Sequence, residues 1–298
     1  MKGRCAFVAP GVGPSYLPRV VHRAEDYPTT ADIPWLDRPD AMEQIAARQA
    51  AGEIDGRQAG LLRKWVRDGY VSLSGVLDQP TVDEINADVA AVIEANQHLP
   101  IAELRLKIQD NFTESAATRR AMMLPSVLEF MDLLLGRRAL PYQTLSLPVS
   151  SQIAPHVDAI LMTSHPRDYL IAAWFALESI QPDSGPLVLY PGSHKLPYIS
   201  AGEVGIPRGA SEAECSSVYD ARFYDLVAER VESNGFQLYT HLPACGDVLF
   251  WHSNLVHGAT APASPDATRK SLIVHYFGEG AEHYSDLFNR RCDLPGLR

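Results

Sequence analysis

Two potential metal ligands, His156 and Asp158, stand two residues apart in the stretch 154–159. The surrounding run, 152–162, is typical of a β-strand, in which alternate side chains point to the same face. We therefore expect the imidazole and the carboxylate to lie side by side and to bind one ion together. Completed by a second histidine, such a pair makes the facial triad that holds non-haem Fe(II) with open coordination positions. An HxD triplet often arises by chance, so the rest of the chain must supply the third ligand.

The third ligand is expected on another strand, and the C-terminal half offers His257 and His252. His257 follows Asp158 by 99 residues and precedes Gly258, which allows close approach of another backbone segment. We favour His257 over His252 because of the residues that follow it.

A turn formed by residues 262–266 leads into a returning strand that begins at Arg269. Arg269 and Ser271 share one face of this strand. A planar guanidinium there could bind a carboxylate through two parallel hydrogen bonds, and the hydroxyl could supply another. The sequence therefore predicts an anion-binding group near the metal.

The composition describes an ordinary globular chain of 298 residues, 46% of them hydrophobic, which suffices for a large core. A net charge of -10 disfavours nucleic acid and anionic membranes as partners. The sequence contains no apolar run long enough to span a membrane and no secretion signal. The cysteines are too scattered for a CxxC pair, which favours reduced thiols and a cytoplasmic location: Cys5, Cys215, Cys245 and Cys292. We expect a monomer or homodimer that acts on a small molecule.

The N-terminal part divides into an irregular arm and a set of helices. Residues 1–39 are rich in proline and lack hydrophobic periodicity, so they are expected to wrap the surface of a single domain, 40–298. Residues 40–138 are predicted to be its helical support. One helix is expected to begin at Asp40, with Glu43 as its capping-box partner, and a second to run from Asp55 to Gly69. A third follows Pro80 and has one apolar stripe, and a fourth covers 125–135. Short strands are expected at 70–73 and 104–108.

From about residue 139 the pattern changes to short β-rich runs without helical crossovers, which indicates a sandwich, barrel or jelly roll. This core is assigned to 139–278, followed by a C-terminal tail, 279–298. The strands are predicted at 142–147, 152–162, 170–177, 187–189, 248–251 and 269–277. An insertion, 196–245, holds one predicted helix, 219–233, and is interpreted as a lid over a pocket or as a cover for one sheet face.

Several short motifs occur in a characteristic order: Lys107 to Asp110 (KIQD), His156 to Asp158 (HVD), Ala173 to Leu177 (AWFAL), Asp183 to Leu187 (DSGPL), Pro191 to Lys195 (PGSHK), Gly246 to Val248 (GDV), His257-Gly258, and Arg269. The ordered series resembles the phytanoyl-CoA dioxygenase-like (PhyH) family of Fe(II)/2-oxoglutarate-dependent oxygenases. The resemblance covers about residues 60–278.

The resemblance implies a mainly β fold with flanking helices, built on a double-stranded β-helix or cupin-like jelly roll. It implies iron ligands at His156, Asp158 and His257, and a 2-oxoglutarate site that includes Arg269, Lys107 and Trp174. Ser271 and Gln152 are further candidates for the cosubstrate site. One position departs from some relatives, which carry a hydroxyl residue where this chain has Ala259; Ser271 or Thr260 could compensate. The interval from His257 to Arg269 is also about one residue longer than usual in the family, which the proline-containing turn can absorb.

The family chemistry uses Fe(II), 2-oxoglutarate and O2, releases succinate and CO2, and most often hydroxylates an unactivated C–H bond. Relatives that halogenate lack the carboxylate ligand, so Asp158 favours hydroxylation of a small or medium-sized organic metabolite. Desaturation, epoxidation or rearrangement of a natural product by the same cofactors is the alternative. A non-catalytic metal-binding sensor is a second alternative; a cupin-like hydrolase or isomerase is disfavoured, because it would not need Arg269 and Lys107 as carboxylate anchors.

Substrate contacts are expected beside the HxD segment and from 198–239. The candidates are Ile160, Met162, His165, Arg167 and Tyr169. If the substrate is anionic, Arg167 or Arg208 could bind it.

Overall fold

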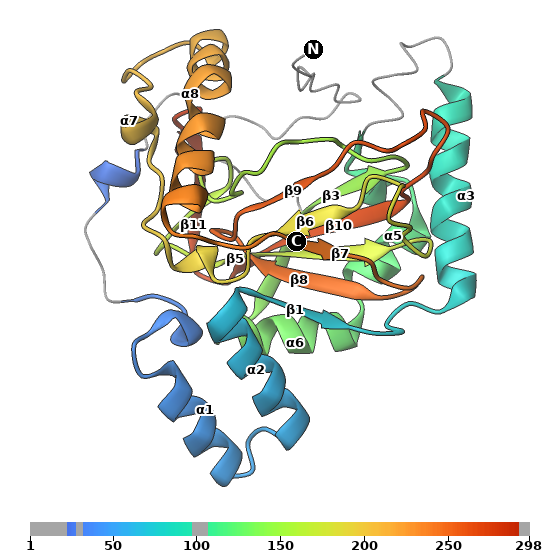
Figure 1. The fold of residues 1–298 in the computed structure, drawn as a ribbon. Helices are drawn as coiled ribbons and strands as arrows, with labels where there is room; N and C mark the ends of the chain where they lie inside the picture. Colours follow the sequence, from blue (N-terminus) through green and yellow to red (C-terminus); the bar gives the residue numbers. More distant parts are fainter. Residues whose placement is uncertain (1–22, 28–31, 97–106, 292–298) are drawn as a thin grey trace.

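The computed structural model describes residues 23–27, 32–96 and 107–291. Its largest sheet, the major sheet, has six antiparallel strands in the order β1-β8-β5-β10-β3-β2 (Figure 1). These strands are β1 (Tyr70–Leu73), β2 (Ile108–Gln109), β3 (Ala139–Leu147), β5 (Leu170–Ala176), β8 (Val248–His252) and β10 (Ser271–Gly278). None of the described helices is long and apolar enough to cross a membrane.

A second sheet, the minor sheet, has the order β7-β6-β9 and faces the major sheet. Its strands are β6 (Leu187–Leu189), β7 (Tyr239–His241) and β9 (His257–Ala259). Ring contacts join the two sheets: Trp174 of β5 meets His241, and Trp251 of β8 meets His257. The space between the sheets therefore receives side chains from both, including the predicted ligand His257.

A third sheet, in the order β12-β11-β4, joins β4 (Thr163–His165) to β11 (Glu282–Ser285) and β12 (Arg290–Arg291). Residues 279–291, which were assigned to a tail, thus contribute strands and the buried residues Asp286 and Leu287. They belong to the packed body of the domain.

The alternation of side chains on the major sheet separates an inner face from an outer face. Trp174 of β5 stands opposite both Ile273 of β10 and Leu249 of β8, and all three face the minor sheet. Outward-facing residues such as Phe175 and Phe250 pack against the helices in the main hydrophobic cluster.

The helices that cover the outer face come mainly from the N-terminal half. They are α1 (Ala41–Ala50), α2 (Gly56–Asp68), α3 (Gln79–Ala95), α5 (Ala116–Met122) and α6 (Pro125–Leu135), with 3-10 turns η2 (Trp35–Asp37) and η3 (Asn111–Thr113). A further 3-10 turn, η1 (Ala24–Asp26), lies elsewhere, against Asp286 and Arg208. Helical support and a mainly β core agree with the sequence analysis, except that α5 was not predicted.

Local capping signals were largely correct. Asp55 and Gln58 form both hydrogen bonds of a capping box, and Gly69 ends α2 in the left-handed conformation, as predicted. The capping box predicted for Asp40 and Glu43 is wrong, because the Asp40 side chain does not cap α1 and accepts instead from Gln44.

The segment 196–245 contains α7 (Ala201–Val204), α8 (Glu212–Ser233) and β7, and follows the turn η4 (Ser193–Lys195). The predicted start of α8 at residue 219 was two turns late, because the capping box of Ser211 and Glu214 was overlooked. The α8 helix stands at one end of the strands and α3 at the other (Figure 1). The segment supplies a strand of the minor sheet as well as its helix.

Two strand predictions differ from the structure. Residues 152–162 do not form a strand: Pro155 precedes a one-residue bridge at His156, and a turn starts at Asp158. The strand of Arg269 begins two residues later, at Ser271. Of the predicted strand 104–108, residues 104–106 lie outside the described residues, and β2 begins at Ile108.

Candidate active site

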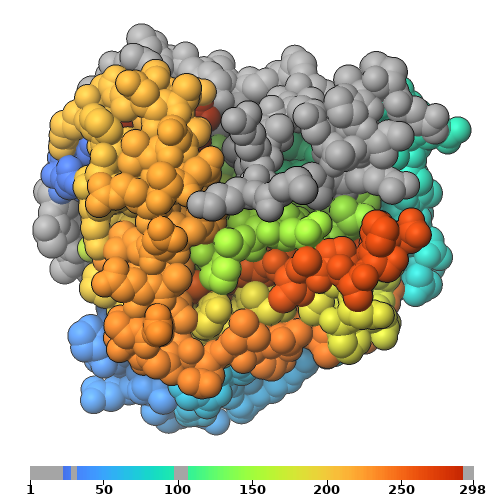
Figure 2. Space-filling view, turned by 45° about the horizontal axis from the view of Figure 1, so that its top comes forward, coloured from blue at the N-terminus to red at the C-terminus, as the bar shows by residue number. Residues whose placement is uncertain are grey.

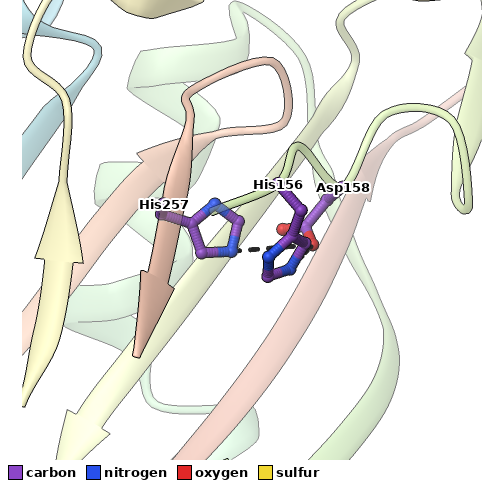
Figure 3. A group of neighbouring side chains, drawn as sticks. All are labelled: His156, Asp158 and His257. Atoms are coloured by element: carbon purple, nitrogen blue, oxygen red, sulfur yellow. Dashed lines mark ion pairs between the residues drawn. The ribbon is translucent and has the colours of Figure 1, made fainter. Parts of the chain in front are cut away.

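The three predicted metal ligands lie together between the sheets. One ligand atom each of His156, Asp158 and His257 falls within a group 4.8 Å across (Figure 3). The Asp158 Oδ1 oxygen lies 3.8 Å from His156 Nε2 and 3.7 Å from His257 Nε2. Two imidazole nitrogens and one carboxylate oxygen converging in this way match the donor set of a facial triad.

Backbone pairing, rather than a regular strand, brings the ligands together. His156 and His257 exchange both main-chain hydrogen bonds, at 2.8 and 2.9 Å. Asp158 donates its backbone N–H to the Ser253 carbonyl, and its own carbonyl accepts from Leu161 and Met162 in a turn. His156 and Asp158 lie side by side as expected, but the expected cause is wrong. The bridge at His156 and the turn at Asp158, and not a shared strand face, place them together.

Both triad histidines are oriented by their own neighbouring backbone. His156 Nδ1 lies 2.9 Å from the Ala154 carbonyl and His257 Nδ1 lies 3.0 Å from the Leu255 carbonyl. A carbonyl can only accept, so each Nδ1 carries the proton and each Nε2 presents a lone pair to the site.

The electrostatics of the triad also favour metal binding. Burial and the neighbouring His257 lower the pKa of His156 to about 4, so its ring is neutral at pH 7. Burial alone would raise the pKa of Asp158, but His257 and His275 outweigh it and hold that pKa below its usual value. A neutral imidazole and an ionised carboxylate are the forms that bind a metal.

The other carboxylate oxygen, Asp158 Oδ2, accepts a hydrogen bond from Trp251 Nε1 at 2.9 Å and lies 3.8 Å from His275 Nε2. The sequence analysis assigned no role to either residue. Strand alternation could have identified His275, because His275 lies on the same face of β10 as the predicted site residue Ser271.

Apolar packing supports the triad from behind. Val157 and Val256, each adjacent to a triad ligand in the chain, are buried in one cluster with Phe223 and Val227 of α8. Figure 2 shows α8 beside the segments around residues 150–156 and 257–268. The insertion therefore forms part of the core behind the ligands.

Arg269 lies deep in the protein and forms no ion pair with a carboxylate of the described residues. The side chain is 1% exposed, and neither Nε nor Nη1 has a hydrogen-bond partner among the described residues. Burial lowers its pKa to about 10, so the guanidinium is still charged at pH 7. A buried, unpaired cation is costly, so the side chain fits a site for a carboxylate ligand.

Other buried polar atoms surround this guanidinium. Its Cζ lies 5.7 Å from the centre of the Trp174 ring, and Trp174 lies edge-on to His241. Among the described residues, Trp174 Nε1, Ser271 Oγ and His241 Nε2 also make no hydrogen bond. These groups are unused polar partners suited to an anionic ligand, and His241 was not among the residues predicted for this site.

The turn before β10 is held by Glu178. Its carboxylate accepts from the Lys270 backbone at 2.7 Å and from Thr268 Oγ1 at 2.9 Å, while the Arg269 N–H donates to the Pro148 carbonyl. These hydrogen bonds fix the backbone of residues 268–270 and therefore the position of the Arg269 side chain.

The remaining cosubstrate candidates have different positions. Lys107 is half-buried and close enough to His156 to contribute to lowering its pKa. Gln152 is exposed in a left-handed backbone conformation and is not among the buried polar groups around Arg269. Thr260 Oγ1 donates to the Pro186 carbonyl.

Among the predicted substrate contacts, Met162 is linked directly to the triad, because its backbone N–H donates to the Asp158 carbonyl. Its Sδ accepts from Gln143 Nε2 at 3.1 Å, and the same amide lies 3.2 Å from His275 Nδ1. His165 is half-buried and stacks on Tyr27. Arg167 is exposed.

Three other predicted contacts have partners elsewhere in the structure. Ile160 is fully buried in the α8 cluster, and Tyr169 is buried in the helical cluster with its hydroxyl donating to Asp32. Arg208 pairs with Glu25 and Asp26 at the surface. Contact of these three residues with the substrate stays a prediction.

The rival histidine, His252, lies outside the triad. Its Nε2 lies 3.3 Å from Asp37 Oδ2, and its Nδ1 accepts from the Asn254 backbone. Both ring nitrogens are thus engaged, which leaves His257 as the third ligand candidate.

Comparison with known proteins agrees with this geometry. Residues 65–271 match the family model described as Phytanoyl-CoA dioxygenase (PhyH). The peroxisomal phytanoyl-CoA dioxygenases of Bos taurus and Homo sapiens are 26% and 24% identical, over 65% of this chain in each case. The matches cover 56% and 55% of those relatives, so the chain spans little more than half of their length.

Solved structures with the same fold include the epimerase SnoN in complex with Fe3+, alpha ketoglutarate and nogalamycin RO (23% identity, TM-score 0.58, covering 88% of this chain and 93% of that one). They also include EctD from S. alaskensis with 2-oxoglutarate and 5-hydroxyectoine (17% identity, TM-score 0.59, covering 96% and 94%). These likenesses confirm the predicted cupin-like jelly roll. Since the family model covers most of the chain and includes all three triad residues and Arg269, the protein belongs to the phytanoyl-CoA dioxygenase (PhyH) family.

Proposed function

We propose that this protein is an Fe(II)- and 2-oxoglutarate-dependent dioxygenase that hydroxylates a C–H bond of a small or medium-sized organic metabolite. The observation that carries the proposal is the pairing of a facial triad with a buried, unpaired guanidinium. A metal site alone would not need Arg269, and a buried cation alone would not need two histidines with free Nε2 atoms.

Iron and 2-oxoglutarate, when bound, supply the oxidative chemistry, in which O2 and the cosubstrate yield succinate, CO2 and one oxygen atom for the substrate. His156, Asp158 and His257 would hold the iron. Arg269 would bind a carboxylate of the cosubstrate through its unpaired N–H groups. The protein thus contributes position, charge and exclusion of water.

Hydroxylation is preferred to halogenation because Asp158 fills the carboxylate position. SnoN, named above as an epimerase, shows that one fold hosts several outcomes. Desaturation, epoxidation and rearrangement are therefore the alternative outcomes that analysis of the reaction product has to distinguish.

We place the substrate on the side of the triad where Met162, Gln143 and His275 contact one another. A thioether, an amide and an imidazole there offer apolar contact together with hydrogen bonding.

The test is anaerobic reconstitution with Fe(II), followed by visible absorption spectroscopy as 2-oxoglutarate is added. We expect a metal-to-ligand charge-transfer band in wild type. In Arg269→Ala the band should require much more cosubstrate, whereas Lys270→Ala, which removes the adjacent cation, should titrate like wild type.

Absence of the band despite one bound iron would refute the dioxygenase assignment. A band without 2-oxoglutarate-dependent O2 consumption, across a substrate panel, would favour the sensor alternative.

A further inference from the structure

The two oxygens of the Asp158 carboxylate have separate environments. Oδ1 faces the Nε2 atoms of His156 and His257, at 3.8 and 3.7 Å. Oδ2 accepts the indole N–H of Trp251 at 2.9 Å. Trp251 is 1% exposed and Asp158 6%, so this hydrogen bond is shielded from water.

A second donor approaches the same oxygen. His275 Nε2 lies 3.8 Å from Asp158 Oδ2, and His275 Nδ1 lies 3.2 Å from the Gln143 amide nitrogen. An amide nitrogen can only donate, so Nδ1 accepts and Nε2 carries the proton toward Asp158. Two N–H groups from two strands thus point at Oδ2.

The indole itself cannot readily turn away. Trp251 lies on β8, which pairs with β1 on one side and β5 on the other, and its ring lies 4.7 Å from the His257 ring. An indole N–H is a donor without acceptor capacity, and leaving it unpaired in the core costs free energy.

We infer that Trp251 is a positioning residue that makes Asp158 a one-oxygen ligand. This inference rests on the proposed function. With Oδ2 held by Trp251, Asp158 offers Oδ1 alone to the iron, and the coordination position that a second oxygen would take is left for cosubstrate or O2. His275 supports the same orientation over a longer distance.

The test compares Trp251→Phe with Trp35→Phe, since both remove a buried indole N–H that donates a hydrogen bond, and Trp35 lies in the helical cluster outside the active site. Co(II), a redox-stable probe, is titrated anaerobically, with affinity from calorimetry and ligand number from the visible spectrum. We expect Trp251→Phe to raise the Co(II) Kd about 10- to 100-fold, as for other residues that orient metal ligands, and to alter the spectrum. Trp35→Phe should leave both unchanged, because the Trp35 indole donates to the Leu133 carbonyl in the helical cluster and not to Asp158.

If Trp251→Phe disturbs folding, 3-benzothienylalanine at position 251 retains both rings and lacks the N–H, and the same change in Kd is expected. An unchanged Kd and spectrum in a folded variant, or equal losses in both phenylalanine variants, would overturn the inference. Failure of the wild type to bind Co(II) would instead overturn the proposed function.

Discussion

His156 and His257 are joined by an antiparallel bridge in which each backbone N–H donates to the carbonyl of the other residue. Their ring centres lie 4.4 Å apart. Residues 101 positions apart in the chain are thus held as one unit by main-chain bonds. The spacing of the two imidazoles depends on this bridge and on the backbone around it.

Gly258 allows the bridge to form. A Cβ at this position would meet the Ile153 carbonyl oxygen at 2.9 Å and the Pro155 backbone at 3.0 Å, which are closer than Cβ contacts normally come. Gly258→Ala should therefore push residues 153–155 away and lower metal affinity about tenfold or more. Calorimetric titration with Co(II) measures this.

Gly60→Ala is the control, because a Cβ on this glycine of α2 would meet nothing within 4 Å. That variant should bind the metal like wild type and be as stable or slightly more stable. Equal metal affinity for both variants would contradict the role assigned to Gly258.

Arg269 should lower the stability of the protein in the absence of ligand. Arg269→Met keeps an unbranched, flexible side chain that fills the space of the arginine methylene stem, while removing a buried charge with unpaired N–H groups. We expect the metal-free variant to be more stable than wild type by about 1 to 3 kcal/mol, and to lose 2-oxoglutarate binding. Urea unfolding measures the free energy of unfolding of both metal-free proteins. A variant less stable than wild type would mean that Arg269 has a compensating partner.

Three buried histidines outside the triad should make stability fall at mildly acidic pH. Burial lowers the pKa of His194 to about 3 and of His241 and His283 to about 4, from an ordinary value of about 6.5. At pH values between the lowered pKa of the folded chain and the ordinary pKa of the unfolded chain, the unfolded chain binds more protons. The free energy of unfolding therefore falls as the pH falls from 6.5 toward 4. Although burial opposes it, Asp37 raises the pKa of His252, so this histidine stabilises the folded state fully below about pH 6.5, loses that effect as the pH rises further, and contributes little to the slope below pH 6.5.

His283→Phe isolates one of these protons. A phenylalanine can maintain the stacking on Phe277, whose ring centre lies 3.8 Å from that of His283, and it cannot titrate. The dependence of unfolding free energy on pH between 6.5 and 4.5 should become shallower by about 1.4 kcal/mol per pH unit at most. Urea titrations at intermediate pH values measure the slope; an unchanged slope would show that His283 is not buried in its neutral form.

Packing of α8 should matter for metal binding as well as for stability. Val227 of α8 lines a small pocket together with Val157 and Val256, the residues next to the triad ligands. Val227→Ala should destabilise the fold by about 1 to 3 kcal/mol and weaken Co(II) binding about threefold to tenfold.

Val82→Ala is the matched control, because Val82 is equally buried, on α3, in the other hydrophobic cluster. It should cost similar stability, with Co(II) affinity retained. If both variants lose metal affinity to the same extent, the effect reflects general destabilisation and the supporting role of α8 is refuted.

The features predicted correctly from sequence were those whose cause is local. The Asp55 capping box joins residues three apart, and the left-handed end of α2 at Gly69 follows from one residue type. The ligand types were likewise readable, because HxD, a later histidine and an arginine form an ordered series.

What only the tertiary structure decided were contacts between distant segments. The sequence predicts a strand over residues 152–162. The structure has instead a single bridge from His156 to His257 and a turn that begins at Asp158. The bond from Trp251 to Asp158 spans 93 residues. The sequence by itself determined which side chains could bind iron and a dicarboxylate; their orientation was decided by the packing of β8, β9 and α8 around them, because hydrophobic periodicity specifies a face and not the partner that the face will meet.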